Sequence, residues 1–175
     1  GTSSYSTLYS IPTGIYPYTI TDNNGCIVQD TVYITEAIAI SLVENFSNVN
    51  CYAGNDGSID LSISGGTGPF SFLWNTSDTT EDISNLVIGT YSYTITDALG
   101  CTFTDTVSIN QPSPIYVSDS ITNVSCANGN DGVAILNISG GTTPYIQNWG
   151  INNPLSLTAG NYQFIVTDDN GCNYI

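Results

Sequence analysis

The stretch that decides the fold is Gly-Thr-Tyr-Ser-Tyr-Thr-Ile-Thr-Asp-Ala-Leu-Gly-Cys, residues 89–101. Apolar residues alternate in it with small polar ones, and a period of two predicts a half-buried β-strand. Tyr91, Tyr93 and Ile95 share one face of that strand. The closing Asp-x-x-Gly-Cys predicts a tight turn, because glycine adopts the positive φ that other residues resist.

The same pattern occurs three times in the chain. It returns as Gly-Ile-Tyr-Pro-Tyr-Thr-Ile-Thr-Asp-Asn-Asn-Gly-Cys at 14–26 and as Gly-Asn-Tyr-Gln-Phe-Ile-Val-Thr-Asp-Asp-Asn-Gly-Cys at 160–172. An internal repeat of this length predicts tandem modules. Trp74 and Trp149 are 75 residues apart, whereas Gly89 and Gly160 are 71 apart. This change in length predicts a surface loop between the Trp and the Gly.

We expect three units: the C-terminal half of a repeat at 1–37, a complete repeat at 38–112, and a third repeat at 113–175 that is truncated in its last strand. Short alternating strands without helical periodicity predict an all-β chain. Six or seven strands in about 75 residues favour an immunoglobulin-like β-sandwich of two packed sheets in each full module.

The composition excludes several functions. The chain of 175 residues has no Lys, Arg or His and fifteen acidic residues. Nucleic-acid binding is not expected because phosphate contacts need cations. Membrane insertion is not expected, because no run of about 18 apolar residues occurs. We expect no enzyme, since a His or Lys base is missing. Glu81 and Asp82 are the only paired carboxylates considered for glycoside hydrolysis, but the third module has no equivalent.

Calcium is the one cofactor that the sequence leaves open. Asp56 and Asp131 lie in Gly-Asn-Asp-Gly loops, and Asp97 and Asp168 lie in the hairpin turns, as does Asp22. Ca²⁺ prefers clustered oxygen ligands, which such loops offer. Aspartate also favours turns through local backbone hydrogen bonds, and the spacing matches no EF-hand loop.

Five cysteines are spread singly through the chain, without a Cys-x-x-Cys pair or a His that would support a zinc site. This distribution indicates disulfides formed in an oxidising compartment. We predict Cys51–Cys101 and Cys126–Cys172, with the partner of Cys26 outside the fragment. A rival pairing, Cys26–Cys51 and Cys101–Cys126, has a constant spacing and stays open.

The combined motifs resemble a known family. Cys-x-x-Gly-x-Asp-Gly is followed by Ser-Gly-Gly-Thr-x-Pro, a Trp, Gly-x-Tyr and Thr-Asp-x-x-Gly-Cys. Together they resemble the SprB repeat of very large Bacteroidetes surface proteins, including gliding-motility adhesins. The resemblance covers nearly the whole chain, with small departures such as Val133 in place of Ser58. It implies secretion by the type IX system and an extracellular location on the bacterial cell surface.

We therefore expect a structural or adhesive repeat segment, the stalk of an adhesin. Expected partners are neighbouring repeats of the same chain and surface polysaccharide or other surface proteins. One alternative is a subunit segment of an extracellular filament. Another is a carbohydrate-binding module, although the aromatic residues fall mostly on the inward phase of the strands.

Four Asp-[Ser/Thr] sites resemble the Bacteroidetes O-glycosylation signal: Thr31, Thr79, Thr106 and Ser120. Strand alternation predicts that Thr31 and Thr106 point outward, and Thr79 falls in the variable loop. The alternative is that Asp-Thr is simply common in Thr-rich strands.

Overall fold

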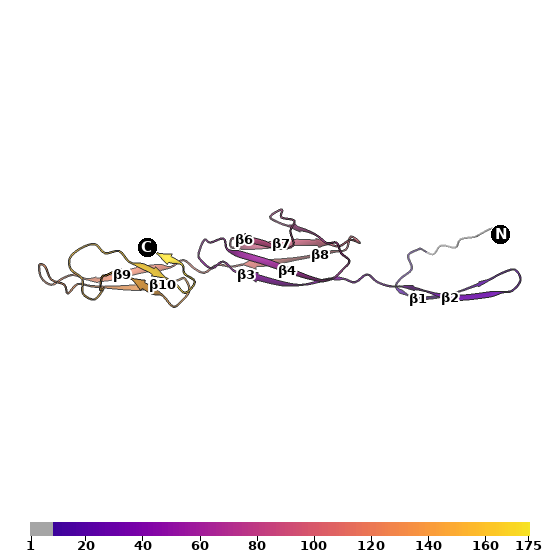
Figure 1. Cartoon of the computed structure of the whole chain (residues 1–175), viewed down its shortest axis with the longest axis horizontal. Coiled ribbons are helices and arrows are strands. Elements are labelled where there is room, and N and C mark those ends of the chain that lie inside the picture. Colours follow the sequence, from indigo (N-terminus) through magenta and orange to yellow (C-terminus); the bar gives the residue numbers. More distant parts are fainter. Residues whose placement is uncertain (1–8) are drawn as a thin grey trace.

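The computed structural model describes residues 9–175, and within that range its regular secondary structure consists of strands. This confirms the prediction of an all-β chain. No helix of the described residues is long and apolar enough to cross a membrane. Figure 1 shows three groups of strands in line along the long axis of the chain. We call them the first module (residues 9–37), the second (38–112) and the third (113–175). Residues 1–8 of the predicted first unit lie outside the described range.

The second module is a sandwich of two antiparallel three-stranded sheets. One sheet has the order β3-β4-β6 and the other β5-β7-β8, the pairing of strands A-B-E and C-F-G in an immunoglobulin sandwich. The strands are β3 (Ile40–Ser47), β4 (Gly57–Gly65), β5 (Ser71–Trp74), β6 (Ile83–Leu86), β7 (Gly89–Thr96) and β8 (Thr102–Ile109).

The core of this module follows from the alternation in β7. Tyr91, Tyr93 and Ile95 are buried, as the period of two predicts. Trp74 at the end of β5 is also buried between the sheets, and its ring lies 4.9 Å from that of Tyr93. The indole Nε1 of Trp74 donates to the carbonyl of Thr80 at 2.9 Å, so the polar edge of this large side chain is satisfied.

A tyrosine corner lies where the chain enters the strand before the Asp-x-x-Gly-Cys turn in all three modules. The hydroxyl of Tyr91 donates to the carbonyl of Val87 at 3.0 Å, four residues upstream. Tyr16 makes the same bond to Pro12 and Tyr162 to Thr158, at 2.8 and 3.0 Å. The three sequence repeats therefore share the same hydrogen bond. This tyrosine corner is a hallmark of immunoglobulin-like sandwiches.

The third and first modules have fewer strands than the second. The third contains β9 (Tyr116–Thr122) paired with β10 (Val133–Ser139), and a small sheet of β11 (Ile146–Asn148), β12 (Ile165–Thr167) and β13 (Asn173–Tyr174). The first is a hairpin of β1 (Gly14–Thr21) and β2 (Ile27–Ile34). The expectation of six or seven strands is thus met only by the second module. Tandem immunoglobulin modules along the whole chain stay a prediction.

Candidate functional site

The turn aspartates that were considered for calcium are engaged by the backbone. Oδ1 of Asp97 accepts the N–H groups of Leu99 and Cys101 at 2.9 Å, and its Oδ2 accepts that of Thr67 at 3.2 Å. Burial alone would raise the pKa of Asp97, but these hydrogen bonds hold it below its ordinary value. The carboxylate thus fastens the β7–β8 turn to the loop after β4.

Asp168 repeats this arrangement in the third module. Its two oxygens accept the N–H groups of Cys172 and Thr142, each at 2.9 Å. In the first module the N–H of Cys26 donates to Oδ1 of Asp22 at 2.8 Å. The same turn therefore occurs in all three modules, each time held by the equivalent aspartate.

The loop aspartates Asp56 and Asp131 also bind backbone. The N–H groups of Asn50 and Ser125 donate to their Oδ1 atoms, both at 3.0 Å. The Ser125 side chain and then its N–H lower the pKa of Asp131. Residues 9–175 contain no group of three His, Cys, Asp or Glu side chains arranged to hold a metal. The four calcium candidates are thus distributed over separate turns and loops.

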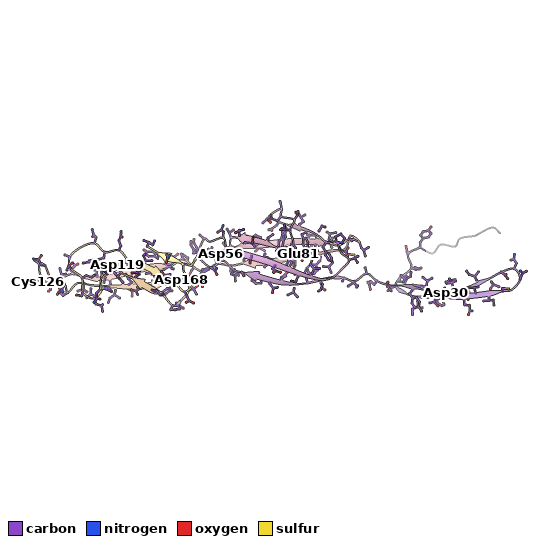
Figure 2. All side chains as sticks on the ribbon, in the orientation of Figure 1. Asp30, Asp56, Glu81, Asp119, Cys126 and Asp168 are labelled. Carbon is purple, nitrogen blue, oxygen red and sulfur yellow. A yellow bond between two sulfur atoms is a disulfide. The ribbon has the colours of Figure 1, made fainter. Side chains whose placement is uncertain are left out.

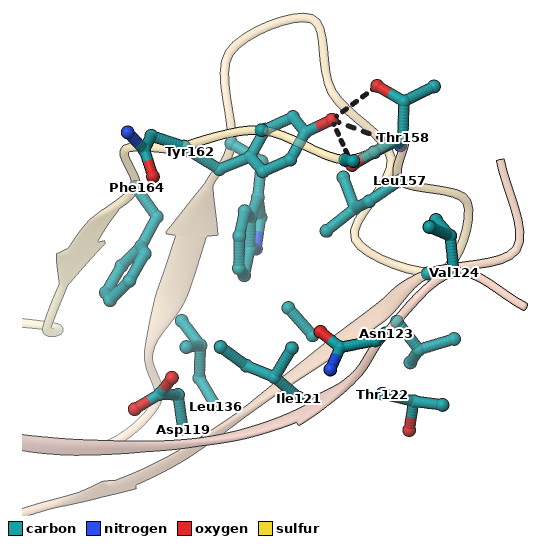
Figure 3. A pocket seen from close by; sticks show the side chains of 17 residues that line it. Asp119, Ile121, Thr122, Asn123, Val124, Leu136, Leu157, Thr158, Tyr162 and Phe164 are labelled. Atoms are coloured by element: carbon teal, nitrogen blue, oxygen red, sulfur yellow. Dashed lines mark hydrogen bonds between the residues drawn. The ribbon is translucent and has the colours of Figure 1, made fainter. Parts of the chain in front are cut away.

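The third module holds a cavity of about 560 Å³ (Figure 3). Side chains fill the equivalent space in the second module. In the second module the space between the sheets takes Val107 and Ile109 of β8, which are both buried. A Cβ on Gly57 would lie 2.9 Å from Ile109, and the equivalent Gly132 lines the cavity. The cavity of the third module therefore lies at the position where Val107 and Ile109 pack in the second module.

Two polar groups lose their partners around this cavity. The hydroxyl of Tyr93 donates to Glu44 in the second module, and burial together with this bond raises the pKa of Tyr93. The equivalent pair in the third module is Phe164 and Asp119, which line the cavity without such a bond. Nε1 of Trp149 is buried without a hydrogen-bond partner among the described residues. Four residues are missing from the loop that supplies the acceptor of the other tryptophan.

The disulfide of this structure joins two modules. Cys51 of the second module is bonded to Cys172 of the third, with 5.6 Å between the Cα atoms. Cys26, Cys101 and Cys126 are exposed free thiols. Both pairings considered from the sequence, Cys51–Cys101 with Cys126–Cys172 and the 25-residue alternative, therefore differ from the structure and are corrected here.

The direction of the strands explains the correction. Cys101 precedes β8, whereas the far end of β8 lies beside the Cys51 loop, where the N–H of Val49 donates to Asn110 at 2.9 Å. An eight-residue strand separates the two cysteines by about 26 Å, and a disulfide needs Cα atoms within about 7 Å. The equivalent Cys126 and Cys172 lie at opposite ends of the third module for the same reason.

Further contacts hold the junction between the second and third modules. Nδ2 of Asn170 donates to the carbonyl of Asn50 at 2.9 Å and to Oγ1 of Thr142 at 3.1 Å, so it bridges the modules beside the disulfide. Within the second module, Oε1 of Gln111 accepts the N–H of Ala53, two residues after Cys51, at 2.9 Å. Two prolines follow within three residues of this glutamine and stiffen the linker. Residues of both modules at this junction line a groove of about 370 Å³.

Sequence reasoning missed Asn170 and Gln111. A signal for Asn170 does exist, because the third module has polar Asp169 and Asn170 in this turn where the second has Ala98 and Leu99. Such a difference marks a turn that meets another surface.

The four predicted glycosylation positions differ in exposure. Thr79, Thr106 and Ser120 are exposed, whereas Thr31 is half-buried in the first hairpin. The predicted outward placement thus holds for Thr106 and less completely for Thr31. Modification of the four hydroxyls stays a prediction.

Of the paired carboxylates Glu81 and Asp82, Asp82 accepts the N–H of Leu61 at 3.0 Å.

Tandem β-modules, of which the second and third are joined by a disulfide, define the class of this chain, a serial repeat protein. The model of the SprB repeat matches it at residues 43–79 and 118–146, which lie in the second and third modules. The chain therefore contains two matches to the SprB repeat, a repeat that occurs in cell-surface proteins. No curated protein matches the chain.

Proposed function

We propose that the chain is a stalk segment of a bacterial surface adhesin, in which stiff modules in series hold a binding region away from the cell. The observation that carries this proposal is the junction between the second and third modules. A disulfide, a side-chain hydrogen bond and a linker with two prolines act there together. A linear stack in which each module contacts only its neighbours extends in length with every repeat.

The alternatives receive less support. Both tryptophans are buried, so they are not available to stack on a sugar ring. We propose a mechanical role without catalysis. A filament is favoured by the same end-to-end geometry as a stalk, and therefore forms the second candidate. Gliding motility is one process that such a stalk would serve.

We further propose that glycans attached at Thr79, Thr106 and Ser120 cover the exposed faces of the modules. Thr106 lies on β8, at the edge of its sheet. A glycan on such an edge strand would hinder side-by-side pairing of modules. The intact mass of the natively secreted chain tests this, because a mass equal to the bare sequence less disulfide hydrogens would contradict it.

Antibody labelling of intact cells tests the stalk. An antibody against the second module should label intact cells of the organism that makes the chain, at a distance from the outer membrane that grows with the number of intervening repeats. An antibody against a periplasmic protein is the control and should label only permeabilised cells. The proposal is contradicted if the module also becomes accessible only after permeabilisation.

A further inference from the structure

Three side chains in the core of the second module form a series of contacts from one sheet to the other. Trp74 on β5 and Tyr93 on β7 are both buried, and their ring centroids lie 4.9 Å apart with the planes tilted by 49°. The hydroxyl of Tyr93 donates to the carboxylate of Glu44, which lies on β3 in the opposite sheet. The contacts therefore run from an indole through a phenol to a carboxylate.

The phenol of Tyr93 is bonded to a group that can take its proton. A phenol that loses an electron also loses its proton, and an ionised carboxylate accepts one readily. Burial, together with the bond to Glu44, raises the pKa of Tyr93, so the neutral phenol is the resting form. Tyr91 differs, because its hydroxyl donates to the backbone carbonyl of Val87, which is not a base.

The indole of Trp74 has the opposite kind of partner. Its Nε1–H donates to the carbonyl of Thr80 at 2.9 Å. A backbone carbonyl does not remove this proton, so an indole that has lost an electron keeps its N–H. One electron, without a proton, then restores the original side chain.

The third module shows that aromatic packing at this place does not need the phenol. Phe164 stands at the position of Tyr93, and its ring centroid lies 5.1 Å from that of Trp149. Asp119, labelled on the third module in Figure 2, stands at the position of Glu44. The ring pair is thus kept without a hydroxyl, and the phenol–carboxylate pair of the second module is an addition to the packing.

We propose that Trp74, Tyr93 and Glu44 form a one-electron relay, in which Tyr93 restores an oxidised Trp74. A radical oxidant first takes one electron from the indole and is itself reduced. The oxidised indole then takes one electron from Tyr93, while the phenol proton moves from Oη to the carboxylate of Glu44. The products are intact Trp74, a neutral phenoxyl radical on Tyr93 and a protonated Glu44. This relay protects the core indole of the second module from oxidation, a function that goes beyond the stalk and does not depend on it.

Pulse radiolysis of the full chain in azide solution tests the relay, because the azidyl radical takes one electron from indole. The chain has two tryptophans, so Trp149→Phe is introduced throughout to leave Trp74 as the single indole. The absorption of the oxidised indole and that of the phenoxyl radical are followed in the same sample. We expect the first to decay as the second rises, at a rate that does not depend on protein concentration, because the transfer is intramolecular.

Two substitutions remove the two steps separately. Tyr93→Phe removes the electron donor and should slow the decay of the oxidised indole by about tenfold or more. Glu44→Gln keeps a hydrogen-bond acceptor but cannot take the proton, and should also slow the decay. Amide hydrogen exchange in β7 checks that each variant keeps the fold.

Matched controls remove similar groups that the relay does not use. Tyr91→Phe removes another buried phenol of the same strand face, and Asp105→Asn removes the carboxylate opposite Tyr93 on β8. Both should leave the rate unchanged. In the chain that keeps Tyr93 and Glu44, transfer should be slower in heavy water, since a proton moves with the electron. The proposal is overturned if Tyr93→Phe or Glu44→Gln decays at the original rate, if Tyr91→Phe slows the decay equally, or if heavy water has no effect.

Discussion

Replacing Cys172 with serine removes the covalent link at the junction and should destabilise the third module. When this module unfolds while the second stays folded, the disulfide closes a loop of about 60 residues between the end of β8 and Cys172. The chain-entropy model assigns such a loop about 4 kcal/mol of stabilisation. The free energy of local opening in the third module should fall by this amount, and that of the second module should change little.

Amide hydrogen exchange resolved by peptide measures both modules in one sample. A loss of about 4 kcal/mol corresponds to exchange roughly a thousandfold faster, expected for β10 and β12 and not for β4 and β7. Cys101→Ser is the matched control, because it changes the equivalent turn, whose thiol is free. Equal protection of the third module in Cys172→Ser, Cys101→Ser and the unsubstituted chain would refute this reasoning.

Three smaller effects follow from single contacts. Tyr91→Phe removes one corner hydrogen bond and should lower the stability of the second module by about 1 kcal/mol, measured by hydrogen exchange. Tyr162→Phe removes three hydrogen bonds with Thr158 and should lower the stability of the third module by at least as much. Trp74→Phe should cost its module about 1–3 kcal/mol more than Trp149→Phe costs the third, because only the indole of Trp74 has an acceptor. The lowered pKa of Asp97 stabilises the folded state above the unfolded value of about 4, and this contribution is lost as the pH falls through the folded pKa. Urea midpoints between pH 6 and 2 should therefore fall less steeply in Asp97→Asn than in the unsubstituted chain.

Local features were predictable from the sequence because they depend on neighbouring residues. The alternation in β7 specifies which side chains are buried, since side chains on a strand point to opposite faces in turn. The turn of Asp97 and the corner of Tyr91 depend on residues within four positions of each other. The repeats then extended these features to all three modules.

The disulfide was not predictable in the same way, because pairing depends on which end of each module a cysteine occupies. Cys51 and Cys101 are both beside strands, yet one strand length separates them, and the partner of Cys51 is 121 residues away. The unsatisfied indole of Trp149 was not predictable either. Loss of four residues from one loop leaves Trp149 without an acceptor, although Pro144 and Trp149 keep the spacing of Pro69 and Trp74.

The arrangement of modules in series is tested most directly by small-angle X-ray scattering of the full chain under oxidising conditions. Three modules in line, each at least one strand long, span at least about 80 Å, which for a rod corresponds to a radius of gyration of about 23 Å or more. A compact globule of 175 residues would have a radius of gyration of about 16 Å. We predict the larger value, and a value near 16 Å would contradict the account of this chain as a stalk.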